Sequence, residues 1–341
     1  MSVTYEPMPT TLERGDRAEL AAIAEDAIAN GSKSFAAAAR LFPPEIRHSA
    51  MMLYAWCRHC DDVIDGQQLG FARRPLADMP EPMQRLSHLA IDTLGALGGD
   101  RGLHPAFLSV ADVAHRHVLP TGLLIQHLEG YRMDVGGQRY GTIDETLGYC
   151  YRVAGVVGVM MALVMGSDSE KTLDRASDLG IAFQLTNIAR DLVEDARAGR
   201  TYVPADWLAE AGMVADDLTN PAHKVKVAAL AARLVDHAEP YYRSALFGLS
   251  ALPARSAWAV ATAHGVYRQI GLDLKAKGAS AYGTRISTSR GAKLRHVAVG
   301  AAKVAVTRLP WPGKRPTQLW TRSHGRAAGA LRTAGSSRVK P

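Results

Sequence analysis

Two segments 130 residues apart each carry acidic side chains at the spacing of an α-helix. In the first, Tyr54, Arg58, Asp61 and Asp65 stand at offsets of 0, 4, 7 and 11 residues, so they share one face of a helix. The other positions of this helix are largely apolar. We therefore expect the polar face to line an internal cavity rather than to meet bulk solvent.

The second segment repeats this arrangement with Gln184, Asn187, Asp191 and Asp195 at offsets of 0, 3, 7 and 11 residues. Two carboxylates at positions i and i+4 destabilise a helix by roughly 0.2 to 0.5 kcal/mol, and burial increases this cost, so a cation is expected beside them. The alternative is that each stripe is an exposed face paired with neighbouring charges. Two matched stripes on apolar helices favour the cavity.

The residue types at these positions indicate which cation is bound. Oxygen ligands without His or Cys are typical of Mg²⁺, which binds through one or two carboxylates together with substrate phosphates. Arg58 and Arg190 lie within the same two motifs and can complete a diphosphate site. The pattern predicts Mg²⁺ ions, with Mn²⁺ as an alternative, between two facing pairs of aspartates.

The rest of the chain also favours helices. Strand signals are nearly absent, whereas Ala-rich and Leu-rich stretches alternate with Gly and Pro. We predict an all-α fold, with helices over residues 18–29, 34–41, 44–65, 82–97, 105–117, 121–133, 143–166, 169–196, 205–211, 222–248 and 254–277.

Charge divides the chain into an acidic body and a basic end. No acidic residue follows Asp273, whereas 15 of the 40 Lys and Arg residues do, and the net charge of the whole chain is +7. We predict one helical domain over residues 1–284 and a basic tail rich in Gly, Ala and Arg over residues 285–341. The tail is expected to contact an anionic membrane surface, or alternatively to be a solvated and partly disordered end.

One part of the tail has the pattern of a basic amphipathic helix that lies on a membrane, with a plain surface helix as the alternative. Its apolar residues at helical spacing and the basic residues near them are Leu294, Val297, Ala301 and Val304, and Lys293, Lys303 and Arg308.

Cysteine use and the N-terminus bear on the compartment. Three cysteines do not make a disulfide framework, and the first residues contain no apolar signal core, so we expect a cytoplasmic protein, in part at the inner face of the cell membrane. The longest apolar run, Val153 to Gly166, has 14 residues, which is short for a membrane span. We expect it to be a buried core helix.

Motifs around the two stripes add a family resemblance. YAWCRHCDDVIDG (residues 54–66) and QLTNIARDLVEDARAGRTYVP (residues 184–204) closely resemble the two signature regions of the squalene/phytoene synthase family. The likeness is strongest to the bacterial phytoene synthase branch and covers roughly residues 28–285. The further segments that carry it are GSKSF (31–35), EGYRMDV (129–135), YCYRVAGVVG (149–158) and AEPYY (238–242).

The resemblance implies a single-domain isoprenoid synthase bundle around a central cavity. By the same resemblance Asp61, Asp65, Asp191 and Asp195 are catalytic and, with Asn187, ligate Mg²⁺. Contacts to the substrate diphosphates are implied for Gly31, Ser32, Lys33, Ser34, Tyr54, Arg58, Gln184, Arg190, Tyr267 and Arg285. For Ser32 and its neighbours this fits the free N–H groups that a helix N-terminus offers to anions.

The implied reaction is head-to-head condensation of two geranylgeranyl diphosphates through a cyclopropylcarbinyl diphosphate to phytoene, in carotenoid biosynthesis and without NADPH. A C15-specific synthase of the dehydrosqualene or squalene type is the first alternative. A non-catalytic, membrane-associated assembly factor with this fold is the second. No nucleic acid partner is expected. The residues expected to line channels for the two tails, or else to be ordinary core, are Phe35, Val153, Ala154, Gly155, Gly158, Met160, Met161 and Phe183.

Overall fold

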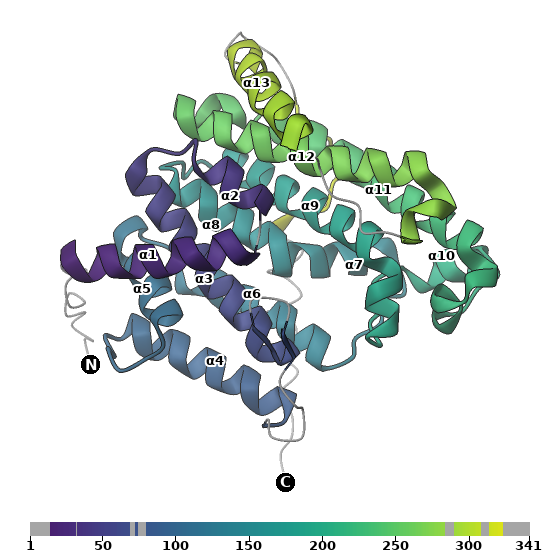
Figure 1. Cartoon of the computed structure of the whole chain (residues 1–341), viewed down its shortest axis with the longest axis horizontal. Coiled ribbons are helices and arrows are strands. Elements are labelled where there is room, and N and C mark those ends of the chain that lie inside the picture. Colours follow the sequence, from purple (N-terminus) through teal and green to yellow (C-terminus); the bar gives the residue numbers. More distant parts are fainter. Residues whose placement is uncertain are drawn as a thin grey trace.

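The computed structural model describes residues 14–31, 33–68, 72–73, 80–283, 290–307 and 314–322, and this part of the chain is built mainly of helices (Figure 1). A two-residue antiparallel pairing joins β1 (Gln67–Gln68) to β2 (Ala72–Arg73). The predicted all-α fold class is confirmed. The α-helices are α1 (Arg14–Gly31), α2 (Lys33–Ala39), α3 (Pro44–Asp65), α4 (Pro82–Leu97), α5 (Pro105–His117), α6 (Thr121–Val135), α7 (Ile143–Cys150), α8 (Val156–Val164), α9 (Glu170–Arg197), α10 (Ala205–Glu210), α11 (Lys224–Leu246), α12 (Ala254–Lys277) and α13 (Arg290–Thr307).

Several helix boundaries follow from residues that start or stop a helix. Proline occupies the first turn of α3, α4 and α5, where its missing N–H group is not needed. Gly66 follows α3 with a φ of 65°, a left-handed conformation that glycine adopts without strain. These three helices and α12 begin and end at the residues predicted from the sequence.

The helix predicted over residues 143–166 is divided into three parts. A single π-helical turn, η2 (Tyr151–Gly155), separates α7 from α8. By length and composition the whole stretch Ile143–Val164 could cross a membrane, but it packs against α6 and α9, and 56% of its most apolar window is buried inside the protein. Its place in the bundle is that of the expected core helix.

The long helix α9 lies at the centre of the bundle and packs against α8, α11 and α12 (Figure 1). Two glycines let its backbone approach the η2–α8 segment closely. A Cβ atom added to Gly158 would lie 2.2 Å from the carbonyl oxygen of Ala176, and one added to Gly180 would lie 2.2 Å from that of Ala154. Because no side chain fits at either position, the two segments are held backbone to backbone.

The described parts of the C-terminal region pack against the helical body. α13 lies on α12, where the indole N–H of Trp258 donates a hydrogen bond to the carbonyl oxygen of Val297 at 2.7 Å. Farther along the chain, Leu319 and Trp320 are buried. The predicted boundary at residue 285 lies outside the described residues and stays a prediction.

Two arginines of this region neutralise an acidic stripe on the outer side of α9. The Arg315 guanidinium donates two hydrogen bonds to the fully buried carboxylate of Asp178, at 2.7 and 2.8 Å. Arg322 pairs with Asp174 at 2.7 Å and also with Glu170. A charge-assisted bidentate pair of this kind is strong, and the carboxylate it satisfies has no access to water.

Replacing Arg315 should therefore destabilise the protein far more than replacing the exposed Lys314 beside it. In Arg315→Met the Asp178 carboxylate stays buried without its cation, so the free energy of unfolding should fall by about 3 kcal/mol. Urea unfolding of this variant and of the matched control Lys314→Met would measure the difference. Equal stability of the two variants would contradict this account of the tail.

Candidate active site

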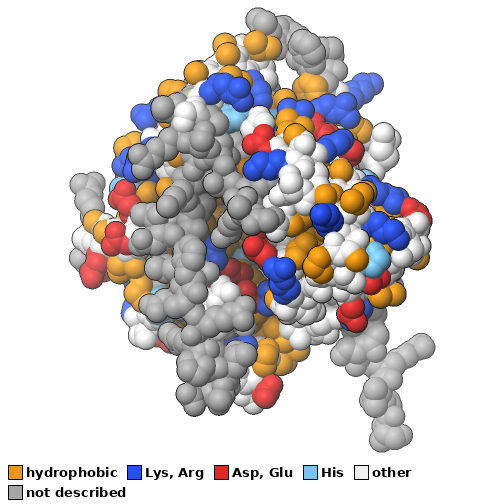
Figure 2. Space-filling model, turned by 45° about the vertical axis from the view of Figure 1, so that its right-hand side comes forward, with side chains coloured by type: hydrophobic (Ala, Val, Ile, Leu, Met, Phe, Trp, Pro, Cys, Tyr) orange, Lys and Arg blue, Asp and Glu red, His pale blue; other side chains and the backbone are white. Residues whose placement is uncertain are grey.

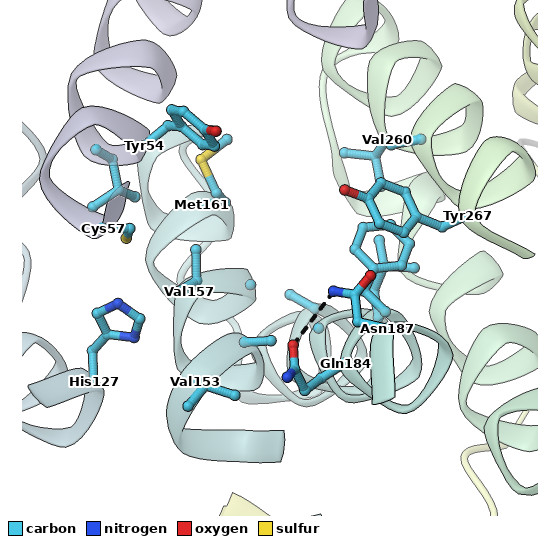
Figure 3. Close-up of a pocket in the computed structure, with 18 of the residues that line it drawn as sticks. Tyr54, Cys57, His127, Val153, Val157, Met161, Gln184, Asn187, Val260 and Tyr267 are labelled. Carbon is cyan, nitrogen blue, oxygen red and sulfur yellow. Dashed lines mark hydrogen bonds between the residues drawn. The ribbon is translucent and has the colours of Figure 1, made fainter. Parts of the chain in front are cut away.

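A cavity of about 610 Å³ lies inside the bundle, and residues of α3, α8, α9 and α12 form most of its wall. This volume lies within the range of small-molecule sites. Figure 3 shows Tyr54 and Cys57 on one side of the space and Val260 and Tyr267 on the other. Carboxylates and guanidinium groups form part of the wall, and small or apolar side chains form much of the rest.

Both predicted stripes face this cavity. From α3 the lining residues include Tyr54, Arg58, Asp61 and Asp65, and Tyr267 of α12 joins them. From α9 the whole predicted set, Gln184, Asn187, Arg190, Asp191 and Asp195, lines the same space. The amide of Asn187 donates a hydrogen bond to the side-chain oxygen of Gln184 at 3.4 Å (Figure 3). The alternative of two exposed faces is therefore wrong in its exposure, although the pairing with neighbouring charges that it included is present.

Three of the four carboxylates are paired with arginines that also line the cavity. Arg58 Nη1 donates to Asp61 at 2.6 Å, and Arg190 Nε donates to Asp191 at 2.7 Å. Asp65 accepts a hydrogen bond from Arg200 at 3.3 Å. Among the described residues, Asp195 has no such ion pair.

Burial and like charge raise the pKa of two of these carboxyl groups. Burial raises the pKa of Asp61 to about 6, against the opposing effect of Arg58 and with a further rise from Asp65. The pKa of Asp195 rises to about 7 because it is buried and because Asp191 lies one turn away. The cavity thus holds more negative charge than its arginines neutralise, and an added cation would relieve it.

Sequence reasoning missed several residues of the polar wall. Four of them lie near the stripes: Asp134 at the end of α6, Tyr149 in α7, and Arg200 and Tyr202 in the loop after α9. All four lie inside segments that carry the family resemblance, which was the available signal. Helical periodicity could not identify Arg200 and Tyr202, because they lie in a loop, which turns at Gly199 with a φ of 79°.

Five predicted diphosphate contacts cannot be placed. Ser32 and Arg285 lie outside the described residues. Gly31 ends α1, and Lys33 and Ser34 begin α2, but the described structure does not extend to the surroundings of Gly31 or to the side chains of Lys33 and Ser34. These contacts stay predictions.

The prediction for the apolar lining is partly right. Val153, Ala154, Gly158, Met161 and Phe183 all line the cavity. Two other predicted residues are not at its surface: Gly155 packs against Ser177 and Ile181, and Met160 is fully buried in the core. The side chain of Phe35 lies outside the described structure.

A family model and individual relatives indicate the same family for this chain. The model of the squalene/phytoene synthase family matches residues 28–295. The chain is 49% identical over 299 residues to a phytoene synthase of Pseudescherichia vulneris, covering 88% of this chain and 96% of that protein. It is 50% identical over 306 residues to a 15-cis-phytoene synthase of Paracoccus sp. (strain N81106 / MBIC 01143), covering 90% and 99% of the two chains.

Comparison with solved structures gives the same fold. The structure matches the crystal structure of a dehydrosqualene synthase in complex with a ligand, with a TM-score of 0.76 and 24% sequence identity. The match covers 86% of this chain and 99% of that one. At this identity the likeness establishes the helical architecture alone.

The raised pKa of Asp195 gives a stability test in metal-free protein. In the unfolded chain Asp195 ionises near its ordinary value of 3.8, whereas in the folded protein it does so at about 7. Between these values the folded state holds the extra proton, so stability falls as the pH rises. Asp195→Asn removes the charge and should raise the free energy of unfolding at pH 8 by roughly 1 to 2 kcal/mol, allowing for solvent screening.

Urea unfolding in the presence of a chelator would measure this gain at several pH values. The gain should shrink toward zero as the pH is lowered from 7 to 4, because the protonated carboxyl resembles the amide. Glu194→Gln, at an exposed neighbour on the same helix, is the matched control and should change stability little. A gain that does not depend on pH would show that the charge of Asp195 is not its cause.

Proposed function

The chain belongs to the squalene/phytoene synthase family and its function is that of a phytoene synthase; we propose that it joins two molecules of geranylgeranyl diphosphate head to head. One observation supports this most directly. Two acidic stripes from helices far apart in the sequence line one cavity whose wall is otherwise largely apolar. Such a space suits a substrate with a highly charged head and a long hydrocarbon tail.

Magnesium ions are proposed as the cofactor, held by Asp61, Asp65, Asn187, Asp191 and Asp195. The donor set fits, because it consists of carboxylate and amide oxygens around excess negative charge. In the described part of the chain no three His, Cys, Asp or Glu side chains already form a metal site. Mg²⁺ binds through one or two carboxylates at a time and completes its shell with diphosphate oxygens and water. Mn²⁺ is an alternative, and NADPH is not expected.

The arginines of the cavity are proposed to change partners when substrate binds. In the described structure Arg58, Arg190 and Arg200 neutralise three of the carboxylates. Bound cations would take over those carboxylates and leave the guanidinium groups free to hold diphosphate oxygens. Tyr54, Gln184 and Tyr267, which line the same space, supply further polar contacts.

In the proposed reaction the polar wall binds the diphosphate of one substrate and stabilises negative charge as this group leaves, which generates an allylic cation. Bound Mg²⁺ would supply further charge stabilisation for the leaving group. The double bond of the second substrate attacks the cation, and loss of a proton closes the three-membered ring to give a cyclopropylcarbinyl diphosphate. This intermediate ionises at the same wall, rearranges and loses a proton to give phytoene. The apolar wall around Val157, Met161 and Phe183 excludes the water that would trap the cations.

Product analysis tests this function. With geranylgeranyl diphosphate and Mg²⁺ the protein should form a C40 hydrocarbon, and chelation of the metal should stop it. Asp61→Ala and Asp191→Ala should each lower turnover by about 100-fold or more, since each removes a charged group from the reacting site. Glu194→Ala, an exposed carboxylate on α9, is the matched control and should stay active.

The substrate and the variants separate the alternatives. A C15 diphosphate that turns over faster than the C20 substrate would favour a synthase of the dehydrosqualene type. No condensation product from either substrate would favour a non-catalytic assembly factor. A C40 product that persists in both aspartate variants would contradict the proposed site.

Peripheral binding to the cytoplasmic face of a membrane is proposed for the C-terminal region. The predicted apolar face of α13 does not point outward as a whole, because Val304 is buried in the core formed with α12. The outward face instead carries Val299 and Val306, which are 41% and 52% exposed. Orange hydrophobic and blue basic side chains mingle at the top of Figure 2, where Figure 1 places α13. An apolar face in a stretch that contains no acidic residue suits anionic lipid.

Vesicle sedimentation tests this contact. The protein should bind vesicles of phosphatidylglycerol more than vesicles of phosphatidylcholine, and added salt should weaken the binding. Val299→Asp with Val306→Asp should lower the bound fraction several-fold. Val225→Asp on α11, at a valine that is 68% exposed, is the matched control and should bind normally. If the Val299→Asp, Val306→Asp protein binds vesicles as well as the Val225→Asp control, the α13 face is excluded as the membrane contact.

A further inference from the structure

One carboxylate of the cavity wall belongs to neither acidic stripe. Asp134, at the C-terminal end of α6, accepts a hydrogen bond at each of its two oxygens. The Tyr202 hydroxyl donates to Oδ1 at 2.9 Å and the Tyr149 hydroxyl donates to Oδ2 at 3.0 Å. Both tyrosines also line the cavity, so Asp134 directs two phenol groups of the wall at once.

The two phenol rings form a stacked pair. Their centroids lie 4.7 Å apart with an angle of 18° between the ring planes. The ring of Tyr140 stands behind them, with centroids 5.6 Å from that of Tyr149 and 6.2 Å from that of Tyr202. Tyr140 does not line the cavity, and its buried hydroxyl has no hydrogen-bond partner among the described residues.

The protonation states of Asp134 and the two tyrosines determine which group donates each hydrogen bond. Burial raises the pKa of Asp134 to about 6, while Arg200 opposes the rise, so the carboxyl is ionised at neutral pH. Burial also raises the pKa of both phenols, which therefore keep their protons. Both hydroxyls donate to the carboxylate, and both tyrosines present part of their side chains to the cavity.

We propose that Asp134 is a positioning residue that turns Tyr149 and Tyr202 into an electron-rich wall for the carbocations of the reaction. This inference rests on the proposed function, because that reaction passes through allylic and cyclopropylcarbinyl cations. A phenol that donates a charge-assisted hydrogen bond to a carboxylate gains electron density on its oxygen and ring. Such a ring attracts a cation, and the attraction is larger in a site without water. The arrangement also keeps phenol protons from pointing at the reacting double bonds.

The test is a set of double variants, because Asp134 should act through the two hydroxyls. Asp134→Asn keeps the shape of the side chain but removes an anionic acceptor. It should lower kcat for phytoene by about tenfold and leave KM for geranylgeranyl diphosphate within about threefold, since the effect is on a charge that develops in the transition state. Asp134→Glu should restore part of the activity. Circular dichroism and thermal unfolding would establish that each variant is folded.

The deciding measurement repeats Asp134→Asn in two backgrounds. In a Tyr149→Phe, Tyr202→Phe protein the substitution should cost less than about twofold, because the hydroxyls through which it acts are already absent. In the matched control background Tyr140→Phe, which lacks a hydroxyl that does not bind Asp134, it should cost the full tenfold. Tyr202→Phe alone removes one hydroxyl and should lower kcat by a smaller factor than Asp134→Asn does.

The outcomes separate this inference from the function on which it rests. A full tenfold loss in the Tyr149→Phe, Tyr202→Phe protein would show that Asp134 acts independently of the tyrosines and would overturn the proposal. A rise in KM at unchanged kcat, or an Asp134→Asn protein as active as the unaltered one, would overturn it equally. If the unaltered protein forms no C40 product at all, the proposed function fails and the inference fails with it.

Discussion

The structure depends on one constraint, which is that five carboxylates, the four of the two stripes and Asp134, share one cavity whose wall is otherwise largely apolar. Isolated charges in such a place are costly, so each must find a cation. In the described structure, arginines from the same motifs or from the next loop serve three of them, and the pKa of Asp195, which has no arginine, is raised to about 7. The features that suit the site to a metal and a diphosphate are thus the same features that make it unfavourable when empty.

Helix α9 carries acidic residues with different surroundings on its two sides. On its inner side Asp191 and Asp195 face the cavity, where cations can exchange. On its outer side Asp174 and Asp178 are held by two arginines of the C-terminal region, and the Asp178 carboxylate has no contact with water. The outer pairs hold the C-terminal region on the body, whereas the inner pairs can give way to substrate. The ion pairs on the outer side therefore stabilise the fold, whereas the carboxylates on the inner side are available for the reaction.

The parts of the site that follow helical periodicity were predictable from sequence. Residues three, four and seven apart on α3 and α9 must share a face, so the stripes and their common cavity followed from spacing and from the apolar character of both helices. Asp134 and Arg200 could not be found in this way, because one ends a helix and the other lies in a loop whose path depends on tertiary packing. The outward face of α13 was also missed, because amphipathic spacing alone does not say which neighbour the apolar side meets. Met160 was wrongly expected at the cavity, because an apolar run without a polar stripe does not show which of its side chains face a cavity and which face the core.

The close contact between α9 and the η2–α8 segment limits how the cavity can evolve. Gly158 and Gly180 already bring the two backbones together, so this wall contains no side chains at the contact that could be shortened to make more room. Any larger residue there would separate the helices and distort the acidic stripe on α9. Changes in the length of hydrocarbon that fits must therefore arise away from this contact, where Phe42, Val157 and Val260 present side chains that can be trimmed or enlarged. The glycine contact is thus a fixed part of the wall, and the side chains around it are where laboratory selection for new chain lengths should search.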